Sequence, residues 1–399
     1  MFFRKMRDKT SKENNNIIDI KEGKRNVRKK KRTTKIVFAL CVIIFAVVVF
    51  MFRDKIEIVK WLNTVDTFFG KGISAQNIEL SYDSSASNPA DWYDGFIAIL
   101  TNRDITMFNS SAKAEFKKDV NLNNPVLKCY DKYTLVYDCG GNELYVTNSY
   151  KEVFYKQFDD SILNARFTKD GHLVVITKMK NYRGVVTVYS SSFKEVYKVY
   201  SASEYVMDAD ISNDGKQLAV AVYDGGFGEI LSAVNIYSMS SEKVKSRIEG
   251  VDGLILSVDM KAGGRTHILT QNGYYVSKDG KEAEEILSVG NNYLKFYDIT
   301  QDDNSVIILD GKLVGKSCNI HMFNAYGVET GDVTVDGNLQ CYDKTDDFVF
   351  VVDDAGLQVY NYDGELTDEM EVSASTEKIL ASDDGKLVVF ETGNVYIIN

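Results

Sequence analysis

The residue types that most often carry catalysis are sparse in this chain. It has 3 histidines, His172, His267 and His321, and each lies within or beside a short apolar run. None belongs to an HExxH motif or to a closely spaced set of metal ligands, so we expect structural roles for all three. The sequence also contains no G-x-S-x-G motif of the kind that presents a nucleophilic serine. We therefore predict no catalytic residue.

Acidic and glycine-rich segments are more frequent, but their settings favour turns. Paired aspartates at 302–303, 346–347 and 353–354 supply the oxygen ligands that Ca²⁺ prefers. None has the spacing of an EF-hand loop, so we predict solvated turns and no metal site. The glycine-rich stretch 225–228 lies between two predicted strands instead of before a helix, which argues against a phosphate cradle. We expect no cofactor.

Five cysteines occur, of which Cys41 lies within a long apolar run. The other four, Cys129, Cys139, Cys318 and Cys341, allow three full pairings, and their spacing does not choose among them. A chain of 399 residues can bury a large core without disulfides. We therefore favour mostly free thiols.

Residues 36–52 form an uncharged run of 17 apolar residues without Gly or Pro, with Ile36 and Phe52 at its ends. This is the short end of the length that crosses a bilayer as a helix. The preceding residues 1–35 hold 14 Lys and Arg against 4 Asp and Glu. Basic residues beside a membrane segment stay in the cytoplasm. The composition therefore predicts a disordered cytoplasmic tail, a transmembrane helix and an extracytoplasmic remainder.

Two other interpretations of this region are less favourable. A cleaved signal peptide has a shorter apolar region of ~7–15 residues and a small-residue cleavage site, and no Ala-x-Ala pattern lies near Phe52. The basic run at 24–32 could contact nucleic acid, but its position against the apolar run already explains it. We predict a retained signal anchor in the cell membrane and no nucleic-acid partner.

The sequence pattern changes twice after the apolar run. In residues 53–76 apolar side chains recur at helical spacing, which predicts a juxtamembrane helical stalk. From residue 77 onward the period becomes two, and short apolar runs alternate with turn signals. Residues 77–399 are therefore predicted to form one all-β extracytoplasmic domain.

Eight of the short apolar runs recur at regular distances, with centres 37–48 residues apart. A repeat of ~40–45 residues that holds four short strands is typical of propeller blades. Asp-Gly pairs at 170–171, 214–215 and 384–385 supply the positive φ that tight hairpins need. We predict a β-propeller of eight blades, or seven if the short fifth unit is not a blade. The eight runs are FIAILT (96–101), YTLVY (133–137), HLVVITK (172–178), QLAVAVY (217–223), THILT (266–270), SVIILD (305–310), FVFVVD (348–353) and KLVVF (386–390).

The last repeat contains three predicted strands, near 376–382, 386–390 and 395–398. Residues 77–82, NIELSY, form a spare strand before the first repeat. Pairing this strand with the last repeat would complete the eighth blade and cover two exposed sheet edges. The sequence thus predicts a ring closed by an N-terminal strand.

Residues 211–222, ISNDGKQLAVAV, resemble the repeat of TolB-like and WD-repeat-like (YVTN-type) propellers. The layout is similar to that of an uncharacterised family of membrane-anchored propellers in Gram-positive bacteria. The resemblance implies the fold of residues 77–399 but no particular activity, because this fold serves many. Eight-bladed quinone-cofactor dehydrogenases resemble one another through a tryptophan-containing blade motif, whereas this chain has only Trp61 and Trp92.

Connections between the second and third strands of each blade must share one face of the ring. The connections predicted to be long are 179–184, 224–232 and 311–317. Loops on a rigid scaffold often carry function, and Tyr and Arg are enriched at binding hot spots. Neutral variation in loop length is the alternative explanation. The residues predicted to border a ligand site are Tyr182, Arg183, Phe227, Lys312 and Lys316.

These observations favour a binding or scaffolding module in the cell envelope, with an envelope protein, a peptide or a glycan as its partner. No catalytic activity is expected. One alternative is a transmembrane sensor that relays a signal to a separate cytoplasmic partner. The other is a glycan-acting enzyme with paired carboxylates. The two carboxylates could come from different blades, and the sequence does not show which side chains lie close together.

The charge distribution predicts the topology of the chain. Protease added to intact protoplasts should digest residues beyond about position 74, while the basic tail stays protected. Antibodies against each end of the chain would follow the two parts on a blot. Digestion of the tail in intact protoplasts would show that the orientation is wrong.

Overall fold

The computed structural model describes residues 76–78, 90–93, 95–109, 113–226, 230–241, 243–300, 302–311, 317–382, 385–391 and 394–398. All of them belong to one compact unit, Lys71–Asn399. The predicted tail, the membrane segment with its ends Ile36 and Phe52, and residues 53–75 of the predicted stalk lie outside the described residues. Among the residues that are described, no helix has the length and apolar content needed to span a membrane.

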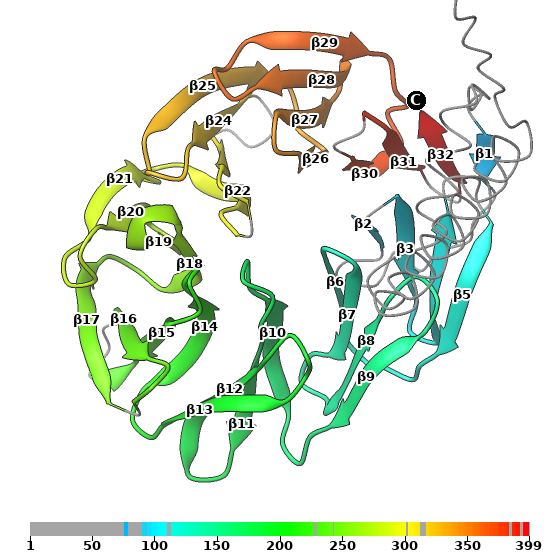
Figure 1. Cartoon of the computed structure of the whole chain (residues 1–399). Helices are drawn as coiled ribbons and strands as arrows, with labels where there is room; N and C mark the ends of the chain where they lie inside the picture. Colours follow the sequence, from blue (N-terminus) through cyan, green and yellow to red (C-terminus); the bar gives the residue numbers. More distant parts are fainter. Residues whose placement is uncertain are drawn as a thin grey trace, which may run out of the picture. The chain divides into compact units, whose positions relative to one another are not determined.

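The described residues form eight antiparallel sheets of four strands each, which follow one another around a ring (Figure 1). Seven sheets consist of four consecutive strands, and we number these blades 1 to 7 in chain order. Blade 1 contains β2 (Ala90–Tyr93), β3 (Phe96–Leu100), β4 (Asp104–Asn109) and β5 (Ala114–Asp119), and blade 2 contains β6 (Pro125–Tyr130), β7 (Tyr133–Asp138), β8 (Glu143–Thr147) and β9 (Glu152–Gln157). Blade 3 contains β10 (Ile162–Phe167), β11 (Leu173–Met179), β12 (Tyr182–Tyr189) and β13 (Glu195–Ser201), and blade 4 contains β14 (Tyr205–Ile211), β15 (Gln217–Asp224), β16 (Leu231–Ser238) and β17 (Val244–Val251).

Blades 5 to 7 repeat this plan, with one short 3-10 helix, η2 (Ala262–Gly264), between two strands of blade 5. Blade 5 contains β18 (Ile255–Lys261), β19 (Arg265–Thr270), β20 (Gly273–Ser277) and β21 (Glu284–Ser288). Blade 6 contains β22 (Tyr293–Asp298), β23 (Ser305–Asp310), β24 (Ser317–Phe323) and β25 (Glu329–Asp336). Blade 7 contains β26 (Cys341–Lys344), β27 (Phe348–Asp353), β28 (Gly356–Asn361) and β29 (Leu366–Met370). The prediction of eight blades is confirmed, and the alternative of seven is wrong.

Blade 8 joins the two ends of the described chain. It contains β30 (Thr376–Ala381), β31 (Leu387–Glu391), β32 (Asn394–Ile398) and, as its fourth strand, β1 (Gln76–Ile78). Asn77 opposes Tyr396 and Ile78 opposes Val395 in this pairing. The predicted closure by an N-terminal strand is therefore confirmed, although the strand begins one residue earlier than expected and its described part ends at Ile78.

The hydrophobic core lies between neighbouring sheets. Middle strands such as β11 read as nearly continuous apolar runs because both of their faces are buried. Val174 and Ile176 of blade 3 share one cluster with Val206, Val220 and Val222 of blade 4. Each sheet thus packs against a hydrophobic core on both of its faces. The ring is therefore a rigid scaffold for the loops.

The predicted Asp-Gly turns join the first and second strands of their blades. Gly171, Gly215 and Gly385 have φ values of 84°, 68° and 83°. These positive values favour glycine, which has no Cβ to clash. The turns share one face of the ring with the connections between third and fourth strands, because strand direction alternates within each blade. We call this the hairpin face.

The opposite face, here called the loop face, carries the connections between second and third strands and the passages between blades. The prediction of a long loop at 179–184 is wrong, because Met179 pairs with Tyr182 and only Lys180 and Asn181 form the turn. Asn181 has φ 73°, a left-handed conformation that asparagine tolerates better than most residues. A two-residue turn is therefore enough, and strand pairing continues to the rim.

All four cysteines in the described part of the chain are free thiols, as we favoured. Cys129, Cys318 and Cys341 are buried, and Cys139 is half-buried. Burial raises the pKa of the Cys341 thiol to about 12. This thiol is therefore neutral at physiological pH and packs as a small apolar residue.

Closure of the ring yields a stability prediction. Replacing residues 77–82 with a Gly-Ser segment of equal length removes the strand partner of β32 and leaves blade 8 with an open edge. We expect the melting temperature of the full chain to fall by at least about 4 °C. The same exchange at the turn residues Asp159, which is exposed, and Asp160, which is half-buried, serves as the control and should change it little. An unchanged melting temperature after the first replacement would contradict closure by this strand.

Candidate ligand cleft between blades 3 and 4

A cleft of about 430 Å³ opens between blades 3 and 4. Its principal side chains come from the loop-face ends of β11, β12, β14 and β15, so four strand termini converge there. Because side chains alternate between the two faces of a strand, aromatic and basic residues from these four strands point into the same cleft. The lining residues are Leu163, Lys178, Met179, Tyr182, Arg183, Tyr205, Val206, Met207 and Tyr223.

An arginine and two tyrosines form a stacked series along this cleft. The guanidinium carbon of Arg183 lies 4.7 Å from the centroid of the Tyr205 ring, and Arg183 Nη1 donates a hydrogen bond of 2.5 Å to the Tyr205 hydroxyl. Tyr205 in turn stacks on Tyr223, with ring centroids 5.0 Å apart and planes 17° apart. Cation–π and ring stacking contacts of this kind are each worth about 0.5–1.5 kcal/mol, so they hold the side chains in one arrangement.

Tyr182 lies beside this series and packs on Tyr200, with ring centroids 5.1 Å apart. Tyr182 and Tyr205 are 40% and 38% exposed, so each presents part of its ring to solvent. Leu231 on β16 is also exposed and pairs with Asp224, next to Tyr223. The rim of the cleft is therefore an exposed aromatic and apolar surface of the kind that often marks a binding site.

The structure brings two of the five predicted rim residues together. Tyr182 and Arg183 are consecutive on β12, and both line the cleft. Phe227, Lys312 and Lys316 lie outside the described residues. Sequence reasoning missed Tyr205 and Tyr223, which belong to strands of the next blade; a search for tyrosines at strand ends on the loop face could have found them.

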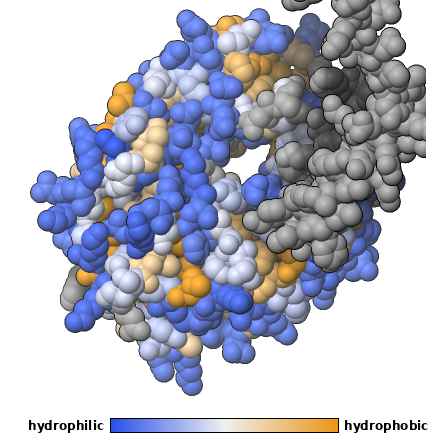
Figure 2. All heavy atoms as spheres, viewed as in Figure 1, coloured by the Kyte–Doolittle hydropathy of each residue, from blue (hydrophilic) through white to orange (hydrophobic). Residues whose placement is uncertain are grey.

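A second cavity, of about 380 Å³, lies at the inner strands, and the space-filling view shows an opening at the centre of the ring (Figure 2). Most of its polar atoms already have protein partners. Lys128 Nζ donates to Asn164 Oδ1 at 2.9 Å and to the carbonyl oxygen of Ala165 at 3.0 Å. Burial lowers the pKa of Lys128 to about 8. The residues that line this cavity are Asp91, Lys128, Cys129, Tyr297, Asp298, Ile299, Thr300 and Tyr342.

The acidic members of the cavity are also engaged. Asp91 Oδ2 accepts a hydrogen bond of 2.8 Å from the backbone nitrogen of Cys129 on the next blade. Asp298 Oδ1 accepts bonds from the backbone nitrogen and the hydroxyl of Thr300, at 2.9 and 3.2 Å. Burial raises the pKa of Asp91. Lys128 and Asp91 thus join neighbouring inner strands, and Asp298 shapes the turn at Thr300. The central cavity is therefore a weaker ligand candidate than the exposed cleft.

A buried ion cluster joins the inner strands of blades 3, 4 and 5. Arg166 lies 3.3 Å from Asp208, 3.3 Å from Asp210 and 2.7 Å from Asp259, and it also donates to the carbonyl oxygen of Val258. Burial alone would lower the pKa of Arg166, but the three carboxylates outweigh it and raise this pKa. The cluster is structural, because every charged member is buried and paired within the protein.

His267 has a structural setting, as expected. Its Nε2 lies 3.1 Å from the carbonyl oxygen of Ala325, so Nε2 carries the proton, and Nδ1 accepts the 2.5 Å hydrogen bond from the Tyr274 hydroxyl. Burial lowers the pKa of His267 to about 4. His172 Nδ1 lies 2.8 Å from Asp170 within one hairpin. The imidazole of His267 is therefore neutral, and its hydrogen bonds with Tyr274 and Ala325 hold it in place.

The prediction of solvated turns fits Asp346, Asp347 and Asp354, which are exposed, but it is wrong for Asp353. Asp353 is buried, and its Oδ1 accepts hydrogen bonds from the backbone nitrogens of Ala355 and Gly356 at 2.7 and 3.1 Å. Asp302 Oδ2 lies 2.6 Å from Lys344 Nζ. Backbone donors thus satisfy Asp353, whereas Asp302 is 40% exposed and also pairs with the buried Lys344.

Eight four-stranded antiparallel sheets in a ring closed by the N-terminal strand define a β-propeller. The sequence model of the DUF5711 family, a family of unknown function, matches residues 73–399, and the chain belongs to this family. The comparison with curated proteins finds no match.

Solved propellers share the fold at low sequence identity. The C-terminal WD40 domain of Sif2 is 12% identical, with a TM-score of 0.54 over 82% of this chain and 98% of that domain. Chaetomium thermophilum Sqt1, bound to the N-terminus of ribosomal protein L10, is 10% identical, with a TM-score of 0.53 over 81% and 100%. BamB from Moraxella catarrhalis is 11% identical, with a TM-score of 0.48 over 82% and 96%. The expected resemblance to WD-repeat propellers is confirmed for the fold.

The buried ion cluster yields a prediction for stability. Replacing Arg166 with Met leaves Asp208 and Asp210 without their cation, while Asp259 keeps Lys261 at 3.6 Å, and should lower the free energy of unfolding by about 3–5 kcal/mol. Arg247 on the outer strand β17 is the matched control, because it pairs at 2.7 Å with Glu204, which lies between β13 and β14. Arg247→Met should cost about 1 kcal/mol or less, because the pair is partly exposed. Denaturant titration of both variants measures the difference, and equal losses would show that the cluster has no special role.

Proposed function

We propose that this chain is a binding module of the cell envelope and that the cleft between blades 3 and 4 is its ligand site. The observation that carries the proposal is the Arg183–Tyr205–Tyr223 series, which is held in place by stacking and faces an open space. Tyrosine and arginine are the residue types most enriched at binding hot spots. Because the contacts within the series order its side chains before a ligand arrives, binding costs little side-chain entropy.

The lining of the cleft indicates the chemistry of its ligand. Tyrosine rings offer flat faces for apolar groups or sugar rings, and their hydroxyls offer hydrogen bonds. Arg183 and Lys178 add positive charge to a chain whose net charge is −10. The described lining is aromatic, basic and apolar, so it offers stacking and hydrogen bonds to a ligand. A peptide segment of an envelope protein or a glycan with acidic groups fits these properties, and binding proceeds without catalysis.

The sequence supports the location of this module. The apolar run between Ile36 and Phe52 anchors the chain in the cell membrane, the basic tail stays in the cytoplasm, and the propeller lies outside. A protein or glycan of the envelope is then within reach of the loop face, and nucleic acid is not. The Sqt1 propeller, of the same fold, is bound to the N-terminus of a ribosomal protein, so a peptide terminus is a ligand that a propeller can hold.

The proposal predicts that partner binding depends on the cleft. The full chain, purified in detergent, is immobilised and exposed to solubilised membrane proteins and to purified cell-wall glycan. The variant Tyr182→Ala with Arg183→Ala should retain the bound partner at least about tenfold less well than the unchanged chain, a loss of about 1.4 kcal/mol. The variant should melt only a few degrees lower, because the contacts that it loses, with Tyr200 and Tyr205, are each worth about 0.5–1.5 kcal/mol. Retention is therefore measured well below the melting temperature of both proteins.

A control with the same chemistry lies on the opposite face. Arg265 stacks on Tyr326, 4.7 Å from its ring centroid, where hairpins of blades 5 and 6 meet. The variant Arg265→Ala with Tyr326→Ala removes an arginine–tyrosine pair from the hairpin face and should leave retention unchanged. Equal retention by the cleft variant and the unchanged chain would place the ligand site elsewhere.

A further inference from the structure

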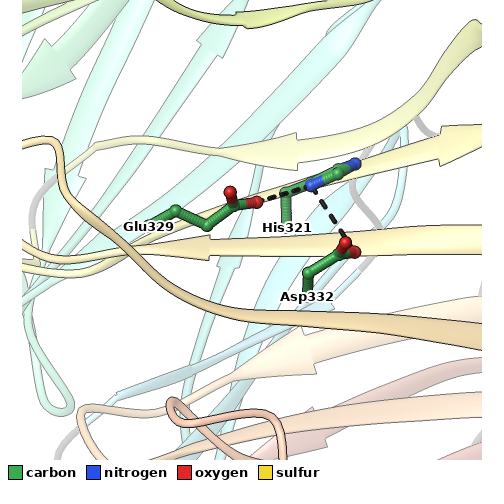
Figure 3. Close-up of side chains that lie close together, drawn as sticks. All are labelled: His321, Glu329 and Asp332. Carbon is green, nitrogen blue, oxygen red and sulfur yellow. Dashed lines mark hydrogen bonds and ion pairs between the residues drawn. The ribbon is translucent and has the colours of Figure 1, made fainter.

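Three side chains that could bind a metal converge on the outer two strands of blade 6 (Figure 3). His321 lies on β24, and Glu329 and Asp332 lie on β25. Nδ1 of His321 is 2.7 Å from Glu329 Oε1 and 3.7 Å from Asp332 Oδ1. One atom of each side chain lies within 4.8 Å of the other two. This group is separate from the cleft, which belongs to blades 3 and 4.

A β-bulge explains why the two carboxylates share one face. Residues three apart on a regular strand point to opposite faces of the sheet. Here His321 opposes Asp332, Met322 opposes Gly331 and Phe323 opposes Glu329, so Thr330 is the extra residue of a bulge. A bulge re-aims the side chains beside it. Glu329 and Asp332 therefore both reach the imidazole of His321.

Blade 3 has the same bulge with different side chains, which shows what is special in blade 6. Thr187 opposes Lys198 there, and Tyr189 opposes Glu195. Thr187 therefore corresponds to His321, Lys198 to Asp332, and Glu195 to Glu329. Lys198 Nζ lies 3.0 Å from Glu195 and neutralises it.

In blade 6 an aspartate stands where blade 3 has this lysine. Within the described residues the only ion pairs of Glu329 and Asp332 are those with His321. Two carboxylates therefore converge on one imidazole without a lysine or arginine between them. A bound cation would supply the missing positive charge.

We propose that His321, Glu329 and Asp332 bind a divalent transition-metal ion of the Zn²⁺ type. One imidazole nitrogen and two carboxylate oxygens suit such ions, whereas Ca²⁺ takes oxygen ligands only. Three protein ligands leave the fourth tetrahedral position to water or to a group from a binding partner.

The present distances are close to what such a site needs. Ligand atoms around a tetrahedral Zn²⁺ with bonds of about 2.0–2.1 Å lie about 3.3 Å apart. The imidazole–Glu329 distance must widen slightly from 2.7 Å, and the imidazole–Asp332 distance must shorten slightly from 3.7 Å. The side chain of His321 is 11% exposed and stays in place, while those of Glu329 and Asp332 are 44% and 60% exposed and are free to turn. Side-chain rotation on a fixed backbone is therefore enough.

Calorimetric titration of the tag-free, chelator-treated full chain with ZnCl₂ tests the proposal. We expect one binding event that weakens at least tenfold in His321→Ala and in Asp332→Asn, while CaCl₂ produces no comparable binding. His172→Ala is the matched control, because His172 pairs with a single carboxylate, Asp170, and should leave the event unchanged. Zn²⁺ should also raise the melting temperature of the unchanged chain but not that of Asp332→Asn.

Asp332→Asn keeps the experiment decisive if His321→Ala does not fold, because the Asp332 side chain is exposed and nearly isosteric with asparagine. Its melting temperature without metal should equal that of the unchanged chain. Zn²⁺ binding of equal strength in the unchanged chain and in Asp332→Asn would overturn the site. Failure of the unchanged chain to bind Zn²⁺ would overturn it as well, and neither result bears on the cleft.

Discussion

Each sheet of this propeller buries both of its faces against neighbouring sheets, so no blade is stable without the blades on either side of it. Ala219 and Ala221 of blade 4 share a core cluster with Ile255 and Val258 of blade 5. Ile97 of blade 1 likewise shares a cluster with residues of blade 8, including Phe390. A blade without a neighbour would expose one of these apolar walls to water, at about 25 cal/mol for each Å². The strand pairing between β1 and β32 therefore has consequences around the whole ring.

Polar contacts on the inner strands set how neighbouring blades are staggered. Asp208 Oδ2 accepts a hydrogen bond of 3.0 Å from the backbone nitrogen of Val258, and Asp343 Oδ2 accepts one of 2.6 Å from that of Ala381. Asp91 makes the same contact with Cys129. Apolar contacts alone would let neighbouring sheets slide along each other. A carboxylate that accepts a hydrogen bond from one particular backbone N–H fixes the relative position of the two sheets. The loop-face ends of β12, β14 and β15 are consequently held in fixed positions, so side chains from two blades can form one cleft.

Much of the fold could be predicted because its signals are local. Period-two apolar runs, Asp-Gly turns at 170–171 and 214–215, and the spare strand near residue 77 are all visible in short stretches of sequence. The length of the turn at Asn181 was not predictable in this way, because one left-handed asparagine replaced a longer loop.

The sites depend on contacts across strands and blades, which a sequence does not display. Tyr182 and Arg183 could be chosen by residue type, but their neighbour Tyr205 comes from the next blade. The three-residue group on blade 6 depends on a bulge at Thr330, and no spacing rule for regular strands would bring Glu329 and Asp332 to one face.

Site-specific photo-crosslinking in living cells can show whether the loop-face cleft binds a partner. A photoreactive phenylalanine analogue at position 182 lies in the cleft, and the same analogue at position 326 lies on the hairpin face. We expect irradiation to link position 182, and not position 326, to one defined envelope component, and we expect Arg183→Ala to reduce the yield. Crosslinking at 326 alone, or equal yields at both positions, would show that the partner does not bind at the cleft.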